Sequence, residues 1–368
     1  MTRFITRDYS PAIARHLTEE GFPEPLARVL AARGIETAED LKADWRAMLA
    51  PETLMGTTAA AQHLADAIDA GKRIMVIADY DCDGATACAV ALKGLRSMGA
   101  SVDYLVPDRF VYGYGLTPAI VDLAAQKGAQ LILTVDNGMA SIDGVAEAKK
   151  MGIDVIITDH HLPAETLPAA ACIVNPNTPG CDFPSKNLAG VGVMYYVLMA
   201  LRAEFRRRGK FDAKTQPRLD ALVDLVALGT VADVVKLDRN NRILVQQGLN
   251  RVRTGHTHPG VKALFEIAGR PSAQAKVRDF GFVIAPRINA AGRLDLMTAG
   301  IECLMSDSDT EAQHYAKILD DYNRQRRELE LDMQWDAAML LNKIDVTKRH
   351  TLALYEPTWH QGIVGLVA

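Results

Sequence analysis

Residues 73–84 read RIMVIADYDCDG, a run of β-branched and aliphatic side chains that ends in three aspartates. Apolar runs of the same kind recur downstream, at residues 101–106, 130–135, 155–158 and 172–175. Ala-rich, helix-favouring stretches separate them. Near-continuous apolar strands linked by helices are typical of a parallel sheet that is covered on both faces. The pattern therefore predicts an α/β domain with a doubly wound parallel sheet over about residues 55–275.

The N-terminal segment, residues 1–54, is predicted to be helical and accessory to this domain. Residues 25–30 form an amphipathic piece. A second helical turn is expected to begin after Thr37, whose side chain is a good N-cap, with Asp40 at the third position of the turn.

The region after the sheet, residues 276–345, is predicted to contain an arginine-bearing loop at 287–293 and a long connecting helix. No Gly or Pro interrupts the charged stretch from Asp307 to about Lys343. This length exceeds that of most globular helices, which favours a helix that joins two lobes. Residues 346–368 are expected to begin a second α/β domain with a strand at 351–355, and we expect this domain to be truncated at Ala368.

The composition excludes several classes of protein. The 368 residues are 49% apolar and 23% charged, with a net charge of −4, which indicates a folded chain of two or three domains. The longest uncharged apolar run, residues 188–201, is shorter than the roughly 18–20 residues of a transmembrane helix, and no secretory signal follows Met1. Five scattered cysteines lack the paired spacing of a zinc site and suit a reducing compartment. We expect a monomeric, cytoplasmic protein without a membrane partner.

Acidic and histidine side chains follow three of the predicted strands. They are found at 79–84, in the Asp136-Asn137-Gly138 turn and in the Asp159-His160-His161 run. Because the carboxyl ends of parallel strands line one crevice, these clusters should converge. An aspartate after a strand is usually only a turn or helix-cap residue, so the argument rests on three clusters at one edge.

Several carboxylates in one crevice repel one another unless cations neutralise them. Carboxylate oxygens combined with imidazole nitrogen suit Mn²⁺ or Mg²⁺, and we expect two such ions. Two ions about 4 Å apart can activate a water molecule and hold the oxygens of a phosphodiester. Asp233 interrupts an apolar stretch, and a buried carboxylate needs a cation or hydrogen-bond donors, so it is the best candidate for a last ligand. The sequence thus predicts metal-assisted hydrolysis of a phosphoester.

These motifs, in this order, resemble the DHH phosphoesterase superfamily. The segments RINAAGR at 287–293 and WHQGIVGLVA at 359–368 narrow the resemblance to the RecJ family of single-strand-specific 5′→3′ DNA exonucleases. The resemblance implies a DHH catalytic domain followed by a DHHA1-like domain. It also implies two-metal hydrolysis of single-stranded DNA that releases 5′-mononucleotides in DNA repair and recombination, with a single-strand-binding protein as a partner.

The resemblance further implies how the metals are held. One ion would be bound by Asp83, Asp136, His160 and Asp233, and the other by Asp81 and Asp136. His161 would face the scissile phosphate, with Asp159 orienting a histidine. Many family members have a histidine four positions before Asp81, where this sequence has Ile77. The second ion should therefore bind more weakly, with water or Asp79 completing its coordination.

The loop at 107–115, PDRFVYGYG, offers an arginine for phosphates and aromatic rings for bases, although an exposed turn is the alternative. The resemblance implies that Arg109 and an arginine of the 287–293 segment, Arg287 or Arg293, bind the 5′-phosphate. Tyr114 would then pack on the terminal nucleotide. Asn289, among small residues, either lets the backbone approach a phosphate or forms a tight helix-packing turn.

Three other functions fit parts of the pattern. A haloacid-dehalogenase-type phosphatase would use Asp81 as a nucleophile, but leaves the Asp159-His160-His161 run unexplained. A DHH relative could act on short oligonucleotides, cyclic dinucleotides or pyrophosphate, which need no extended groove. A binding protein could use the metals only for stability. The histidines at 254–259 are expected to lie in a surface loop. The basic stretch at 204–217 is expected to be a solvated loop or helix end, with a contact to nucleic acid as the alternative.

Overall fold

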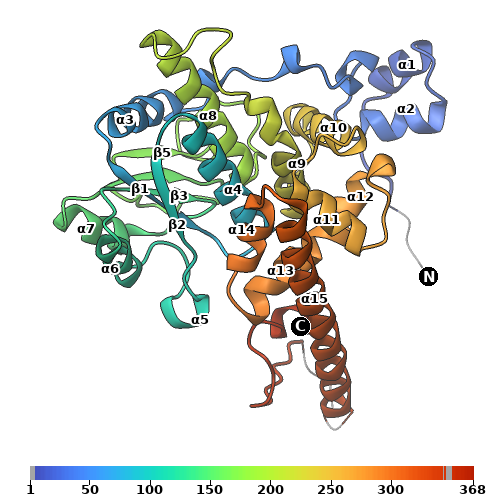
Figure 1. The fold of residues 1–368 in the computed structure, drawn as a ribbon. Coiled ribbons are helices and arrows are strands. Elements are labelled where there is room, and N and C mark those ends of the chain that lie inside the picture. Colours follow the sequence, from blue (N-terminus) through green and yellow to red (C-terminus); the bar gives the residue numbers. More distant parts are fainter. Residues whose placement is uncertain (1–4, 343, 345–349) are drawn as a thin grey trace.

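The computed structural model describes residues 5–342, 344 and 350–368. Its centre is a five-stranded parallel sheet with the order β2-β1-β3-β4-β5 (Figure 1). The strands are β1 Arg73–Ala78, β2 Ser101–Leu105, β3 Leu131–Val135, β4 Asp154–Thr158 and β5 Cys172–Val174. The predicted doubly wound α/β fold is confirmed, and each strand lies where the apolar pattern placed it.

Helices cover both faces of the sheet because alternate strand residues point in opposite directions. Ile74 and Val76 of β1 belong to the larger core, with α3 Thr57–Asp69, α4 Cys82–Ser97 and α8 Gly190–Arg207. Met75 and Ile77 belong to a second core, with α6 Pro118–Gln126 and α7 Ile142–Lys150.

Strand register places the ends of the strands at one edge. Ala78 is paired with Val135, Val135 with Thr158, and Thr158 with Val174. The next residues of the central strands, beginning with Asp79, Asp136 and Asp159, must therefore emerge side by side.

The remaining helices build the layers around this domain. The N-terminal pair α1 Pro11–Glu19 and α2 Glu24–Ala31 has a small core of its own around Leu17 and Ala27. A short turn, Ala38–Leu41, carries the predicted Thr37–Asp40 capping box. The others are α5 Arg109–Tyr112, α9 Val223–Ala232, α10 Arg239–Arg253, α11 Pro259–Ile267, α12 Val277–Asp279, a π-helical turn Phe280–Ile284, α13 Ala285–Leu294, α14 Thr298–Met305, α15 Asp309–Leu341 and α16 Val364–Val367.

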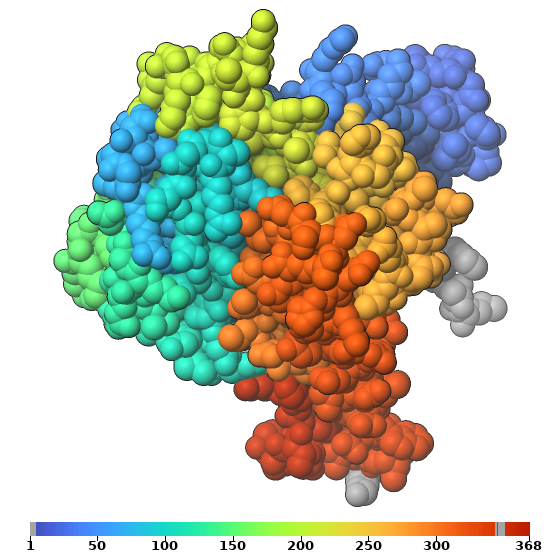
Figure 2. Space-filling model, in the orientation of Figure 1, coloured from blue at the N-terminus to red at the C-terminus, as the bar shows by residue number. Residues whose placement is uncertain are grey.

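The predicted long helix is α15, which has 33 residues and packs on α11, α13 and α14. Its C-terminal half projects from the body of the molecule (Figure 2). The last part of the chain returns to the body, where Gly362 O accepts a hydrogen bond from Arg293 at 3.1 Å and Ile363 is buried. The strand expected at 351–355 does not form, since these residues pair with no strand of the described chain. The other residues expected to begin that domain, 346–349, lie outside the described part.

The structure corrects one expected loop, and it buries one of the two histidines of another, the loop at 254–258, where His256 is exposed. The 287–293 segment belongs to helix α13, which its alanines favour and Pro286 starts. His258 does not lie free on a surface: its side chain is mostly buried, and Nδ1 contacts Asp224 Oδ1 at 2.9 Å. Within the described residues, no helix combines the length and apolar character needed to cross a bilayer.

Candidate metal-dependent active site

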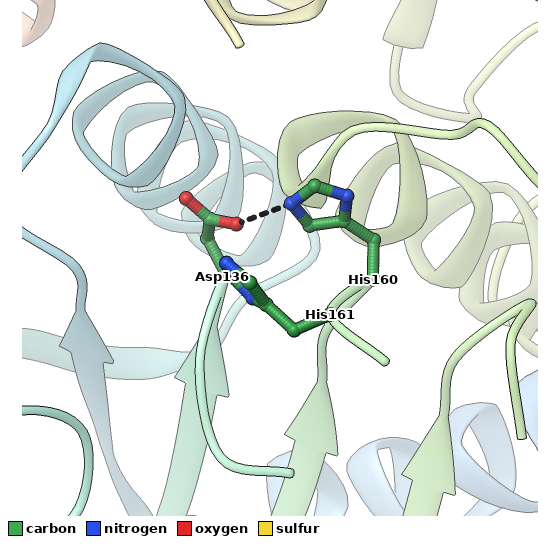
Figure 3. Close-up of side chains that lie close together, drawn as sticks. All are labelled: Asp136, His160 and His161. Atoms are coloured by element: carbon green, nitrogen blue, oxygen red, sulfur yellow. Dashed lines mark ion pairs between the residues drawn. The ribbon is translucent and has the colours of Figure 1, made fainter. Parts of the chain in front are cut away.

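The predicted metal ligands converge at the carboxyl edge of the sheet. The His160 Nε2 atom lies 3.1 Å from Asp136 Oδ1, 3.6 Å from Asp233 Oδ2 and 3.9 Å from Asp83 Oδ2. Figure 3 shows Asp136 and the two histidines reaching toward one another from the ends of β3 and β4. Three overlapping groups have candidate ligand atoms within 4.8 Å of one another: Asp83, His160 and Asp233; Asp79, Asp81 and Asp136; and Asp136, His160 and His161.

Two facing atoms of this cluster lack hydrogen-bond partners. Asp136 Oδ1 and His160 Nε2 are buried, and although they lie 3.1 Å apart, neither makes a hydrogen bond. Burying such atoms without a partner costs about 1–3 kcal/mol each. A divalent cation would satisfy both, so the donor set fits Mn²⁺ or Mg²⁺.

The placement of Asp136 depends on an unusual backbone and a close neighbour. Its φ of 61° lies in the left-handed region, which is uncommon for a residue other than glycine, and its N–H donates to Thr158 O at 3.0 Å. A Cβ atom at Gly190 would lie 2.5 Å from Asp136 Oδ1. Only a glycine therefore lets the start of α8 approach this carboxylate.

Asp81 and Asp83 are held by helix N-termini. Asp81 caps α4 by accepting a hydrogen bond from Gly84 N at 2.9 Å. Asp83 is fully buried and accepts hydrogen bonds from Gly190 N at 2.6 Å and Val191 N at 2.9 Å, at the start of α8. Both carboxylates thus have a fixed orientation before any ion binds.

Burial and mutual repulsion raise the pKa values of the clustered carboxyl groups. Desolvation, then the charge of Asp81, raises the pKa of Asp79 and of Asp83 to about 7. Desolvation, then the charge of Asp83, raises the pKa of Asp233 to about 7 and that of Asp136 well above its usual value. The site concentrates negative charge that a cation would stabilise.

His161 belongs to the third group and is also held by Asp159. Its Nδ1 lies 2.7 Å from Asp159 Oδ1, while Asp159 Oδ2 accepts a hydrogen bond from Met139 N. The hydrogen bond to Asp159 raises the pKa of His161 to about 9. For Asp159 itself, burial favours the neutral form, but the hydrogen bond and charge of His161 outweigh it and lower its pKa. The imidazolium is about half exposed and borders the crevice.

Three of the predicted substrate-binding residues gather beside the Asp79–Asp81–Asp136 group. The Tyr114 ring packs edge-on against His161 at 6.2 Å and against Tyr80 at 6.4 Å, and burial, followed by the charge of Asp79, raises the pKa of the Tyr114 hydroxyl. Burial, followed by the nearby charges of Arg109 and Arg326, lowers the pKa of Arg293. Two cations and an aromatic ring therefore border the metal group on this side.

The other two predicted substrate-binding residues are engaged in helix packing. The guanidinium of Arg287 pairs with Asp320 of α15 at 2.9 Å and donates to Val283 O. Asn289 Oδ1 accepts a hydrogen bond from Cys82 N at 2.7 Å, which fixes α13 against the start of α4. Of the two roles expected for Asn289, contact with a phosphate or helix packing, the structure shows helix packing.

The position of the missing family histidine is apolar in this chain. Ile77 is 1% exposed and lies in the core between the sheet and α6–α7. Asp79 instead joins Asp81 and Asp136 in the second group. Gly190 is a site residue that the sequence analysis missed. The AGVG run at 189–192 was the available signal for a close helix approach.

Comparison with known proteins agrees with this geometry. Residues 73–230 match the family model described as "DHH family, N-terminal domain". The single-stranded-DNA-specific exonuclease RecJ of Escherichia coli is 50% identical over 353 residues, which are 94% of this chain and 61% of that protein. The chain therefore spans about three fifths of the length of this relative.

Two solved structures are similar over most of the chain. A RecJ exonuclease bound to manganese has a TM-score of 0.76 and 36% identity, over 87% of this chain and 78% of the other. The Mn²⁺ complex of RecJ from Thermus thermophilus has a TM-score of 0.81 and 33% identity, over 97% of this chain and 50% of the other. By fold, sequence and site geometry, the chain belongs to the RecJ family of DHH-domain proteins.

Proposed function

We propose that this chain carries the catalytic site of a 5′→3′ exonuclease that degrades single-stranded DNA to 5′-mononucleotides in DNA repair and recombination. The observation that carries the proposal is the set of overlapping metal-ligand groups around Asp136 and His160 at the edge of the sheet. The relatives named as single-stranded-DNA-specific exonucleases, and the solved RecJ structures with Mn²⁺, support the same activity.

Each ligand group would hold one Mn²⁺ or Mg²⁺ ion. Asp83, His160 and Asp233 would hold the first and Asp79 and Asp81 the second, with Asp136 within reach of both groups. When bound, such ions supply Lewis acidity and lower the pKa of a coordinated water. The second ion should bind more weakly, because its group has carboxylates only and Ile77 offers no ligand.

The chain's own residues orient and stabilise the phosphate. Asp159 fixes His161 through Nδ1, which leaves Nε2 of the imidazolium free to donate to a phosphate oxygen. With a pKa of about 9, His161 is protonated at neutral pH and can stabilise the charge that develops there.

The direction of digestion would come from the side of the site that carries the cations. Arg109 and Arg293 bind the 5′-terminal phosphate, and the exposed ring of Tyr114 stacks on the terminal base. A duplex end cannot present a splayed base to this ring. We also propose that the protein acts in the cytoplasm as a monomer, with a single-strand-binding protein as a partner.

The test is time-resolved digestion of a single-stranded oligonucleotide labelled at either end, with and without Mn²⁺. The proposal predicts mononucleotides from the 5′ end only, and none from duplex or short-RNA controls. Turnover confined to short oligonucleotides, cyclic dinucleotides or pyrophosphate would instead assign the chain to another branch of the superfamily.

A further inference from the structure

Two large aliphatic side chains stand almost fully in solvent beside the most polar site of the molecule. Leu162 is 84% exposed and directly follows His161, and Val234 is 86% exposed and directly follows Asp233. Because His160 and Asp233 lie 3.6 Å apart, these two side chains border the same metal-ligand group. A single exposed leucine or valine is ordinary. Two of them beside the ligands of one group point to an apolar binding surface.

Hydrogen bonds and a proline fix the segment that carries Leu162. His160 O and His161 O accept hydrogen bonds from Asn177 and Asn175, and Pro163 restricts Leu162 to extended conformations. Leu162 is therefore displayed from an anchored segment.

Val234 adopts a conformation that its side chain disfavours. Its φ is 61°, in the left-handed region, which is a genuine outlier for a β-branched residue. Because the side chain is exposed, packing within the chain offsets little of the cost of this backbone conformation. Strain of this kind is concentrated at ligand-binding and active sites.

The order of groups across the crevice indicates what would cover the two side chains. Arg293 and Arg109 lie on the side of Asp81, and Tyr114 lies on the side of Asp79. Tyr114 packs against His161, and Leu162 directly follows His161, while Val234 follows Asp233 of the group formed by Asp83, His160 and Asp233. A strand whose 5′ end is held by the arginines, and whose scissile phosphate lies between the two groups, would pass its next nucleotide over Leu162 and Val234.

We propose that Leu162 and Val234 form an apolar clamp for the base of the second nucleotide, on the 3′ side of the scissile phosphate. The inference rests on the proposed exonuclease function and adds a contact that is independent of base identity. A base offers an apolar face, whereas a phosphate or sugar hydroxyl would gain nothing from these side chains. The clamp also favours single strands, because bases in a duplex are stacked and paired.

The test compares a 5′-phosphorylated oligonucleotide with the same strand carrying a tetrahydrofuran abasic residue at position two. Wild-type protein should show about fivefold lower kcat/KM on the abasic strand, equivalent to about 1 kcal/mol at 1.4 kcal/mol per factor of ten. Leu162→Ser should lose about fivefold on the intact strand and little on the abasic one, so that its ratio approaches one. Leu26→Ser, at an exposed leucine of the distant helix α2, should retain the wild-type ratio.

A second variant separates the contact from the strain. Val234→Gly removes the side chain and relieves the left-handed conformation, so the melting temperature should not fall while the preference for the intact strand is lost. Fluorescence anisotropy with Ca²⁺ in place of Mn²⁺ gives the same comparison by binding alone. Wild-type ratios retained in both Leu162→Ser and Val234→Gly would overturn the clamp. A wild-type protein that binds with the preference but digests no strand would refute only the exonuclease proposal.

Discussion

Replacing Gly190 by alanine should disable the site without unfolding the protein. The new Cβ would lie 2.5 Å from Asp136 Oδ1 and 2.5 Å from Asp136 Cβ, whereas ordinary contacts begin at 3.4 Å. One of the two elements must therefore move by about 0.9 Å, which brings the contact close to the short end of the favourable carbon–carbon range, about 3.5–4.0 Å. Asp136 has little room to yield, because its backbone is already left-handed and its N–H is bonded to Thr158 O.

The expected loss follows from the precision that catalysis requires. A misplacement of about 1 Å in an active site can cost about 10²-fold in rate. Since Asp136 is proposed to serve both ions, Gly190→Ala should lower kcat by about two orders of magnitude and weaken Mn²⁺ binding at least about tenfold.

Gly192→Ala provides the matched control two residues further along the same helix. Its Cβ would meet Leu188 Cδ2 at 3.1 Å, the flexible end of a side chain, so activity should stay within about twofold. Both substitutions improve helix propensity by about 0.5–1 kcal/mol, so thermal melting will show whether each variant folds. Hydrolysis assays and calorimetric Mn²⁺ titration then separate rate from affinity. A folded Gly190→Ala protein with wild-type affinity and turnover would refute the close-approach argument and the shared role of Asp136.

Three further predictions concern the charges of the site. The pKa values of about 7 for Asp79, Asp83 and Asp233 mean that these groups hold protons in the folded, metal-free protein that the unfolded chain loses between about pH 4 and 7. The melting temperature in chelator should thus fall as pH rises through this window, and Mn²⁺ should raise it more at pH 7.5 than at pH 5; a flat profile would contradict the pKa shifts. Asp136→Asn should abolish hydrolysis with either Mn²⁺ or Mg²⁺, measured on labelled oligonucleotides, and appreciable residual turnover would exclude the two-metal site. Arg109→Ala should reduce digestion of 5′-phosphorylated strands about tenfold more than that of 5′-hydroxyl strands, and an equal loss on both would show that Arg109 does not bind the end.

The metal site could be predicted because its parts follow from local patterns. Each apolar run specified a strand, and the residues after parallel strands must share one edge, so the proximity of Asp79, Asp136 and Asp159 needed no knowledge of the helices. Asp233 was identified by a different argument, as a carboxylate in an apolar segment. It lies 3.6 Å from His160, as that argument required.

The contacts of individual arginines and amides could not be predicted in this way. Arg287 and Asp320 are 33 residues apart, and Asn289 and Cys82 are 207 residues apart. Which partner such a side chain reaches depends on how α13 packs against α4 and α15. The segment at 351–355 has strand composition but no strand beside it in the described chain, and a strand without a partner leaves its backbone groups unpaired.

The amino-acid sequence by itself determined the sheet, the edge at which the aspartates gather and the kind of ion that they suit, because hydrophobic periodicity and strand polarity act over a few residues. Only the tertiary structure decided which charged groups remain free for a substrate and which are used in packing. It alone revealed the approach of Gly190 to Asp136 and the exposure of Leu162 and Val234. These features depend on the relative placement of helices at atomic distances, and that placement is set by the packing of the whole core.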